Sequence, residues 1–285
     1  MKIVKLFVLL SFFVCSFQAR GGDIISGRAD VATFENYIKQ FKDQKNKPFD
    51  ELLVGTAKYF LGKPYVASTL EISAIERMVI NLRQFDCTTL VENCVALSQV
   101  IKSGDFSYNN YLDRLMTMRY RNGEVSGYTS RLHYTCDWIY ENSNRGILTN
   151  ISLELGGEKV QKEINFMTTH SHLYKHLKDN AQNIQILEEI EKSIKERDSY
   201  EIIPVSKISE NEKGIKSGDI VAFATSVKGL DYSHIGIAYW KNGKLHFIHA
   251  SSRLKKVVVE TRTLLDYCLN SKNCTGISIL RLNRK

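Results

Sequence analysis

The stretch that decides the fold is Ser233–Ser252, SHIGIAYWKNGKLHFIHASS. At its centre Asn242-Gly243 separates two runs of strand-forming residues. Asn-Gly is the strongest short signal for a two-residue hairpin, because a type I′ turn needs positive φ at both positions. A loop of two residues also fixes the register, so we expect Gly236 to lie opposite His249.

This hairpin predicts that two histidines share one face of a sheet. Side chains alternate between faces along a strand, so His234 lies on the face of Gly236 and therefore of His249. The two imidazoles become diagonal neighbours, with Cα atoms roughly 7–8 Å apart. His246 falls on the opposite face, with the isoleucines. The small residues Gly236 and Ala238 predict room for a ligand on the histidine face.

A cysteine that could use these histidines stands at the start of a predicted helix. Asp86 has the character of an N-cap, and apolar residues recur at helical spacing until Gly104 ends the helix. Cys87 lies in the first turn, where unpaired backbone N–H groups and the positive helix end favour a thiolate. Cys94 lies on the apolar side of the same helix and is interpreted as a core residue. A thiol beside two imidazoles is the nucleophile, base and orienter set of a cysteine hydrolase.

Helical patterns come first in the chain and strand patterns come last, which predicts an α+β fold. Helices are expected over 29–42, 48–62, 86–104 and 183–195, and strands over 77–82, 219–224, 234–240, 244–251, 255–260 and 276–282. Successive short strands joined by turns indicate an antiparallel sheet. Residues 105–200 are interpreted as a largely helical elaboration with one strand near 147–153. We expect residues 27–285 to form a single domain.

The composition and the N-terminal sequence exclude several classes of function. The 285 residues are 43% hydrophobic and 25% charged, which excludes a disordered chain. The net charge of +8 comes without a run of five basic residues or a nucleic-acid motif, so we expect no nucleic-acid partner. Two lysines precede the apolar run Leu6–Phe17, which is shorter than the ~20 residues of a membrane span. Residues 1–16 are predicted to be a signal peptide, cleaved between 16 and 20, and no membrane span is expected after its removal.

The protein is therefore expected in the bacterial periplasm or cell envelope. A lipid anchor at Cys15 is the less favoured alternative, since bulky Val14 precedes it. Five cysteines remain after Cys15, and an odd number flags at least one unpaired thiol. Cys268 and Cys274 are close enough in sequence to form a disulfide, which the sequence leaves open.

The sequence gives little support to a metal site. Paired Cys-x-x-Cys spacings are absent, and the two hairpin histidines would need a third ligand. His170, His172 or His176 could supply one, but no acidic or thiol partner clusters with them in the sequence. We expect neither a metal nor another cofactor.

Several segments together resemble the NlpC-type cell-wall cysteine hydrolases, which have a papain-like fold. The segments are FDCTTLVENC (Phe85–Cys94), Gly218-Asp219-Ile220, SHIGIA (Ser233–Ala238) and IHASS (Ile248–Ser252). A second set is similar to the N-acetylmuramoyl-L-alanine amidase-like branch. It comprises GKPYVASTLE (Gly62–Glu71), GYTSRLHY (Gly127–Tyr134) and INFM (Ile164–Met167) with His170.

The resemblance implies roles for three residues. Cys87 would be the nucleophile, His234 the general base and His249 the residue that orients His234. It also implies a papain-like arrangement, in which the nucleophile at a helix N-terminus packs on the C-terminal antiparallel sheet. Tyr65 matches the tyrosine that lies beside the nucleophile in such enzymes.

Four polar residues of the branch-specific motifs are candidates for substrate binding: Glu71, Arg83, Arg131 and His133. Each could instead be a surface charge or a member of an ion pair that supports the fold. The chain departs from common family members in having Cys-Thr-Thr in place of Cys-Ser-Gly. It also has Tyr-Val-Ala-Ser-Thr in place of Tyr-Val-Trp-Gly-Gly. Both departures border the expected substrate groove and favour the amidase branch.

The resemblance thus predicts an exported cysteine amidase that cuts between N-acetylmuramic acid and L-alanine of peptidoglycan or its muropeptide fragments. Two alternatives stay open. One is an endopeptidase that cuts the stem peptide after D-glutamate. The other is a cell-wall-binding protein that keeps the fold without the chemistry.

Overall fold

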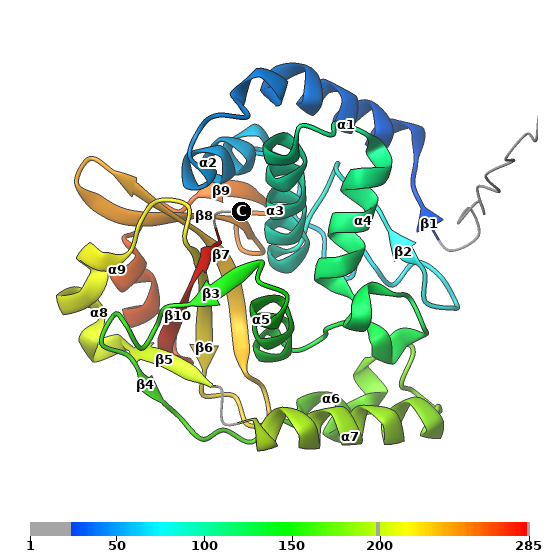
Figure 1. Ribbon diagram of the computed structural model, residues 1–285. Coiled ribbons are helices and arrows are strands. Elements are labelled where there is room, and N and C mark those ends of the chain that lie inside the picture. The colour runs from blue at the N-terminus through cyan, green and yellow to red at the C-terminus, as the bar shows by residue number, and fades with distance from the viewer. Residues whose placement is uncertain (1–23, 198–199, 284–285) are drawn as a thin grey trace, which may run out of the picture.

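One large antiparallel sheet organises the molecule (Figure 1). The computed structural model describes residues 24–197 and 200–283. In the described residues the sheet has the strand order β4-β5-β10-β6-β7-β8-β9, and β3 also pairs with β10. The strands are β3 (Leu148–Asn150), β4 (Glu158–Lys159), β5 (Glu201–Pro204), β6 (Ile220–Thr225), β7 (Tyr232–Lys241), β8 (Lys244–Ser251), β9 (Lys256–Val259) and β10 (Cys274–Leu282).

Helices cover both faces of this sheet, which confirms the predicted α+β class. They are α1 (Arg28–Phe41), α2 (Phe49–Tyr59), α3 (Cys87–Ser103), α4 (Tyr108–Arg119), α5 (Thr135–Asn144), α6 (Phe166–Thr169), α7 (Ala181–Glu196), α8 (Val205–Asn211) and α9 (Leu264–Leu269). Figure 1 shows α8 and α9 on the side of the sheet away from α1, α3 and α4. A small parallel pair, β1 (Ile24–Ile25) and β2 (Met78–Val79), lies outside the main sheet.

The predicted hairpin is present as β7 and β8, in the predicted register. Ile237 lies opposite Ile248, and the pairing continues to the last pair before the turn. Asn242 has a φ of 50° and Gly243 a φ of 75°, as a type I′ turn requires. The sequence signal was sufficient here because the turn alone determines which residues face each other.

The two faces of the hairpin belong to two different cores. The isoleucine face, with Ile235 and Ile237, packs into a large core with α1–α5. The histidine face packs into a smaller core that contains Phe223, Ala238 and Phe247 and residues of α8 and α9. The predicted gap beside Gly236 is wrong, because a Cβ atom there would lie only 2.9 Å from the ring of Phe247.

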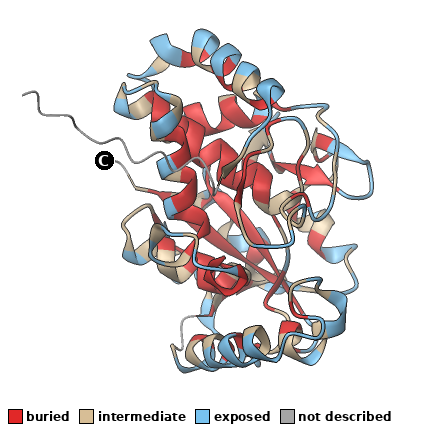
Figure 2. Ribbon diagram, turned by 90° about the vertical axis from the view of Figure 1, so that its right-hand side faces the viewer, coloured by how far each residue is buried: buried red, intermediate tan, exposed pale blue. Residues whose placement is uncertain are grey.

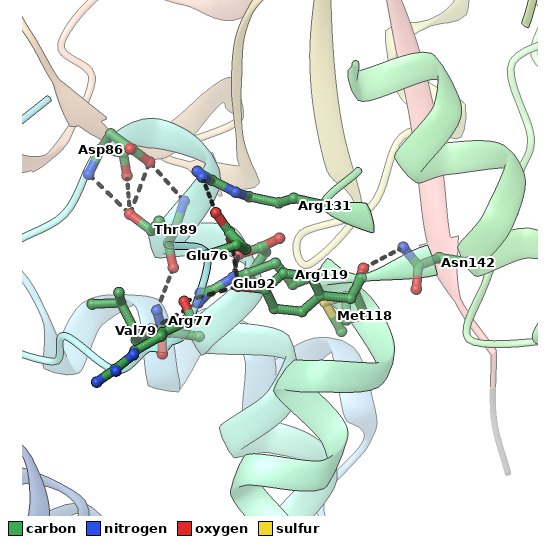
Figure 3. Close-up of polar contacts among 12 residues, drawn as sticks. Glu76, Arg77, Val79, Asp86, Thr89, Glu92, Met118, Arg119, Arg131 and Asn142 are labelled. Atoms are coloured by element: carbon green, nitrogen blue, oxygen red, sulfur yellow. Dashed lines mark hydrogen bonds and ion pairs between the residues drawn. The ribbon is translucent and has the colours of Figure 1, made fainter. Parts of the chain in front are cut away.

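The helix α3 passes through the middle of the large core and is buried from Thr89 to Val100 apart from Gln99. Figure 2 shows buried residues in the interior and exposed residues along the outer helices. A buried helix must pair its polar side chains internally. Glu92 does so through Arg119, whose Nε lies 2.8 Å from its carboxylate (Figure 3). Both side chains are almost completely buried.

Some elements differ from the sequence expectations. The strand expected over 77–82 is only the two-residue β2, because the carbonyl of Val79 accepts a hydrogen bond from Arg119 Nη1 at 2.7 Å. The described part of the segment 105–200 holds four α-helices, but it also contributes β3 and β4 to the sheet. The helix α9 was not expected.

Two predictions on the N-terminal segment cannot be compared with the fold. The predicted signal peptide and Cys15 lie outside the described residues. Within the described ranges, no helix combines the length and the apolar character needed to cross a membrane.

Candidate active site

Two histidine side chains of the hairpin meet, as the face argument predicts. His234 Nε2 lies 2.6 Å from His249 Nδ1, and the two rings are nearly perpendicular. His249 is buried, whereas His234 keeps partial exposure. Through this hydrogen bond the buried ring of His249 orients the partly exposed ring of His234.

A carboxylate that the sequence analysis missed lies behind this pair. Glu260, directly after β9, places Oε2 3.4 Å from His249 Nε2. Its side chain is fully buried. A signal was present in the sequence, because β9 continues the alternation of the sheet. His249 pairs with Val258, so Glu260, two residues further on, has its side chain on the same face.

Cys87 is the first residue of α3, as predicted, and Asp86 caps the helix. The Asp86 carboxylate accepts a hydrogen bond from the Thr89 backbone N–H at 2.8 Å, and Thr89 Oγ1 accepts one from the Asp86 N–H at 3.0 Å. The Cys87 thiol interacts with the backbone N–H groups of Thr88 and Ile235. Since Ile235 directly follows His234, the sulfur lies beside the strand that carries the histidines.

The site holds neutral groups in its resting state. Burial, assisted by the charge of Asp86, raises the pKa of the Cys87 thiol to about 11, although backbone N–H groups act in the opposite direction. Burial, together with His249, lowers the pKa of His234 to about 3. Burial also lowers the pKa of His249 to about 4. The thiolate expected from the helix end is therefore outweighed by burial, and thiol and imidazoles are neutral at pH 7.

Aromatic rings enclose the histidines on the α9 side. The ring of Tyr267 stacks on His234 with centroids 6.0 Å apart and planes at 28°. Phe247 lies 4.6 Å from His249 between centroids. Tyr267 also senses the charge of Cys87, so it lies near the thiol as well as the imidazole. The histidine pair is thus packed against two aromatic rings on this side.

Tyr65, which the resemblance predicts beside the nucleophile, lies within electrostatic range of Cys87. Its backbone N–H bonds to the carbonyl of Lys255, and it forms an isolated bridge with Phe85. The segment is thereby fixed between β9 and the residues that lead into α3. The charge of Cys87 contributes to a raised pKa of Tyr65, after the larger effect of burial.

Three of the four polar candidates form one cluster. Arg131 bridges two carboxylates, with Nη1 2.9 Å from Glu71 and Nη2 2.8 Å from Glu76. His176 Nε2 lies 3.3 Å from the second oxygen of Glu71. His133 joins this cluster through the ring of Tyr128, at 4.3 Å between centroids.

The cluster lies near the start of α3. Figure 3 shows Arg131 and Glu76 close to Asp86 and Thr89, and Glu92 interacts electrostatically with both Asp86 and Arg131. The fourth candidate, Arg83, is engaged elsewhere, since its Nε lies 3.0 Å from the carboxylate of Asp30. It is half-exposed and is not among the contacts of this cluster.

The remaining cysteines and histidines are placed as follows. Cys87, Cys94, Cys136, Cys268 and Cys274, the five in the described part of the chain, are all outside disulfides. The side chains of Cys268 and Cys274 interact, which lowers the pKa of Cys274. His170 stacks on Phe166. Over the described ranges no group of three or more His, Cys, Asp or Glu side chains is arranged to hold a metal ion.

Comparison with known proteins gives a family and several structures. Residues 55–277 match the family model described as N-acetylmuramoyl-L-alanine amidase-like. A Bacteroides uniformis protein named N-acetylmuramoyl-L-alanine amidase is 36% identical, with a TM-score of 0.77, over 83% of this chain and 99% of its own. A comparison with curated proteins finds no significant match.

Two further structures widen the comparison. A Bacteroides fragilis protein provisionally called a xylanase is 36% identical, with a TM-score of 0.74, over 80% of this chain and 100% of its own. The Legionella pneumophila protein LPG0564 is 23% identical, with a TM-score of 0.69, over 90% of this chain and 95% of its own. At that identity the last likeness concerns the fold alone.

Proposed function

Because the chain belongs to the N-acetylmuramoyl-L-alanine amidase-like family, we propose that it hydrolyses the amide between N-acetylmuramic acid and L-alanine. Its substrate would be peptidoglycan or soluble muropeptides. The observation that carries the proposal is the 2.6 Å contact between His234 and His249, on the strand that the Cys87 thiol reaches. A thiol, a base and an oriented second imidazole are what amide cleavage by a cysteine requires.

The reaction begins with proton transfer from the Cys87 thiol to His234 as the sulfur attacks the lactyl carbonyl carbon. The His234–His249 contact uses Nε2, so Nδ1 of His234 is the atom that accepts this proton. Backbone N–H groups at the start of α3, including that of Cys87, stabilise the developing oxyanion. Because both groups begin neutral, charge separates only as the bond forms.

The second half releases both products. The imidazolium of His234 gives its proton to the amine of L-alanine, which leaves as the C–N bond breaks. The sugar stays on the sulfur as a thioester. Water then attacks this thioester while His234 takes its proton, and the muramic acid carboxylate leaves with the thiol restored.

This arrangement supports a papain-like, NlpC-type interpretation of the fold. The nucleophile starts a buried helix, and the base and its orienting residue are on a hairpin of the following sheet. Helix and sheet each contribute one half of the reacting pair. The relation between the three side chains is thereby set by packing of α3 on β7, not by a loop.

The carboxylates around the site argue against the glycoside cleavage that one related protein's name suggests. Glycosidases use two carboxyl groups, one on each side of the bond. Here Glu260 contacts His249 and Arg262, and Asp86 caps α3. Both acids are already engaged, whereas the thiol and His234 have no other evident chemical task.

For substrate contacts we propose Tyr65 beside the nucleophile and the cluster of Glu71, Arg131 and His133. Both terminal nitrogens of Arg131 pair with carboxylates, so its proposed role is to hold Glu71 in place. Glu71 Oε2 forms no hydrogen bond with the described residues, although His176 Nε2 lies 3.3 Å away. It is therefore the atom of this cluster that is best prepared to accept a donor from the sugar or the peptide. We do not extend this role to Arg83.

A digest of purified muropeptides followed by mass spectrometry tests the reaction. The amidase releases free disaccharide and an intact stem peptide, and Cys87→Ala abolishes both products. Shortened peptides still attached to the sugar would show the endopeptidase instead. Products that persist in Cys87→Ala, or their absence from the wild-type digest, would overturn the proposed chemistry.

We further propose that the protein is exported to the periplasm or cell envelope, where this polymer is found. The support is the N-terminal pattern of two lysines followed by Leu6–Phe17. Mass measurement of the mature N-terminus in fractionated cells tests it. A chain that keeps Met1 and remains in the cytoplasm would contradict export. A lipid on Cys15 would show that the exported protein is anchored to a membrane and is not cleaved between residues 16 and 20.

A further inference from the structure

Glu260, the fourth side chain of the site, is an acidic group in a fully buried position. Its side chain has no solvent exposure, and carboxylates are almost never fully buried without a partner. The outer nitrogen of His249, Nε2, lies 3.4 Å from Oε2 of Glu260, an electrostatic contact that is longer than an ordinary hydrogen bond. The position is therefore one where a negative charge acts directly on the histidine pair.

Arg262 keeps this carboxylate ionised. Its guanidinium grips Glu260 with two nitrogens, each 3.1 Å from a different carboxylate oxygen, and its backbone N–H adds a third bond at 3.2 Å. Burial alone would raise the pKa of Glu260, but these bonds outweigh it and hold the pKa at about 2. A fixed negative charge thus lies against His249 at every pH at which the enzyme would work.

That charge decides which nitrogen of each ring carries the proton. A neutral imidazole has one N–H and one bare nitrogen, and the partners of the ring determine which is which. Facing a carboxylate, Nε2 of His249 carries the proton and Nδ1 is bare. A bare Nδ1 can only accept, so Nε2 of His234, 2.6 Å away, must be the donor.

These proton positions determine the state of Nδ1 of His234, the nitrogen that is not bonded to His249. With its proton on Nε2, His234 has a bare Nδ1, which is the state needed to accept a proton from the Cys87 thiol. The reverse arrangement, with the proton of His249 on Nδ1, would force His234 to carry its own proton on Nδ1. The base would then be blocked.

Tyr267 supports the same geometry by contacting both Arg262 and His234. The guanidinium of Arg262 lies over the ring of Tyr267 at 4.7 Å, and that ring stacks on His234. The contacts therefore close a loop that runs from His234 through His249, Glu260, Arg262 and Tyr267 back to His234. A closed loop resists rotation of any one ring, because each member is held from two sides.

We propose that Glu260 is a positioning residue that sets the tautomers of His249 and His234 and so presents a bare Nδ1 to Cys87. The role rests on the proposed function, since it matters only if His234 serves as the base. Glu260 itself touches neither the thiol nor the reacting amide. It acts through His249.

Nitrogen NMR of the histidine rings tests this without any assay of turnover. In ¹⁵N-histidine-labelled wild type at pH 7, both His234 and His249 should carry their proton on Nε2. Signals are assigned with His234→Gln and His249→Gln variants. A wild-type His249 that is protonated on Nδ1 would overturn the proposal, and this result needs no variant at position 260.

The Glu260→Gln variant adds the functional arm. An amide can donate or accept, so we expect mixed tautomers at His249, a kcat at least about tenfold lower and an unchanged KM. Glu163→Gln is the matched control, because Glu163 forms an exposed ion pair with Lys195. It should leave tautomers and kcat as in the wild type. Far-UV circular dichroism verifies that both variants fold.

The outcomes separate the two proposals. Unchanged tautomers and unchanged kcat in a folded Glu260→Gln protein overturn the positioning role while the amidase activity stands. Wild-type tautomers as expected, in a protein that cleaves no muropeptide, refute the proposed function but leave the effect of Glu260 on the rings intact. If Glu260→Gln does not fold, the wild-type spectrum alone decides.

Discussion

The protonation state of Cys87 can be measured directly through its rate of alkylation by iodoacetamide. Only the thiolate reacts, so the rate follows the thiolate fraction. Burial and Asp86 raise the pKa from 9.0 to about 11, which lowers that fraction at pH 7 about 100-fold relative to an unperturbed thiol. We expect the rate constant to rise about tenfold with each pH unit between 7 and 10.

Mass spectrometry of the labelled peptide gives this rate, and Cys87→Ser supplies the background from the partly exposed Cys274. The titratable groups that interact electrostatically with Cys87 include Asp86, Tyr65 and Tyr267. A rate that is high and constant from pH 5 to 8 would refute the reasoning, because it requires a thiolate–imidazolium pair that exists before substrate binds. Substrate-driven proton transfer would then be replaced by a preformed ion pair.

Three other changes test the packing and the site. Glu92→Gln leaves the buried Arg119 without its carboxylate and should cost about 3–5 kcal/mol, seen as a melting temperature lower by about 6–20 °C. Glu92→Leu combined with Arg119→Met should recover most of this loss, and a double variant as unstable as the single one would contradict the electrostatic explanation. Gly236→Ala places a Cβ atom 3.3 Å from that of His249, so kcat should fall about tenfold or more, and an unchanged kcat would show that the ring tolerates displacement. Glu71→Gln should raise KM for a muramoyl peptide about tenfold in steady-state kinetics, whereas a lower melting temperature with the same KM would make Glu71 a structural residue.

The hairpin and the helix start were predictable because each depends on a few adjacent residues. Asn242-Gly243 fixes the register, and the register brings His234 and His249 together. Asp86 is a local capping signal, and it places Cys87 in the first turn of α3. Neither inference needs the rest of the chain.

Glu260 and α9 were missed for a different reason. The position of Glu260 depends on the register between β8 and β9, and the turn between them carries no signal as clear as Asn-Gly. The helix α9 has only six residues, and its sequence, LLDYCL, is too short for a periodic pattern. Its N-cap, Thr263, was the one available signal, since its side chain accepts a hydrogen bond from the Asp266 N–H.

The protonation state and the second core could not be obtained from local patterns at all. The pKa of Cys87 depends on how deeply packing buries it, which is a property of the whole fold. The small residues beside the histidines suggested an opening, but Phe247 from the partner strand fills that space. Segments that are far apart in the sequence pack together around the histidines, and the spacing of residues along the chain does not predict such contacts.

The burial of α3 has a consequence for how far the Cys87 sulfur can move. A helix that is surrounded on all sides, with Leu90 and Val95 fully enclosed, has no direction in which to swing. The packing of α3 therefore holds the Cys87 sulfur, at the N-terminal end of the helix, in a fixed position against the sheet. Changes of side-chain volume at Leu90 or Val95 would shift the Cys87 sulfur. They should slow turnover before they unfold the protein.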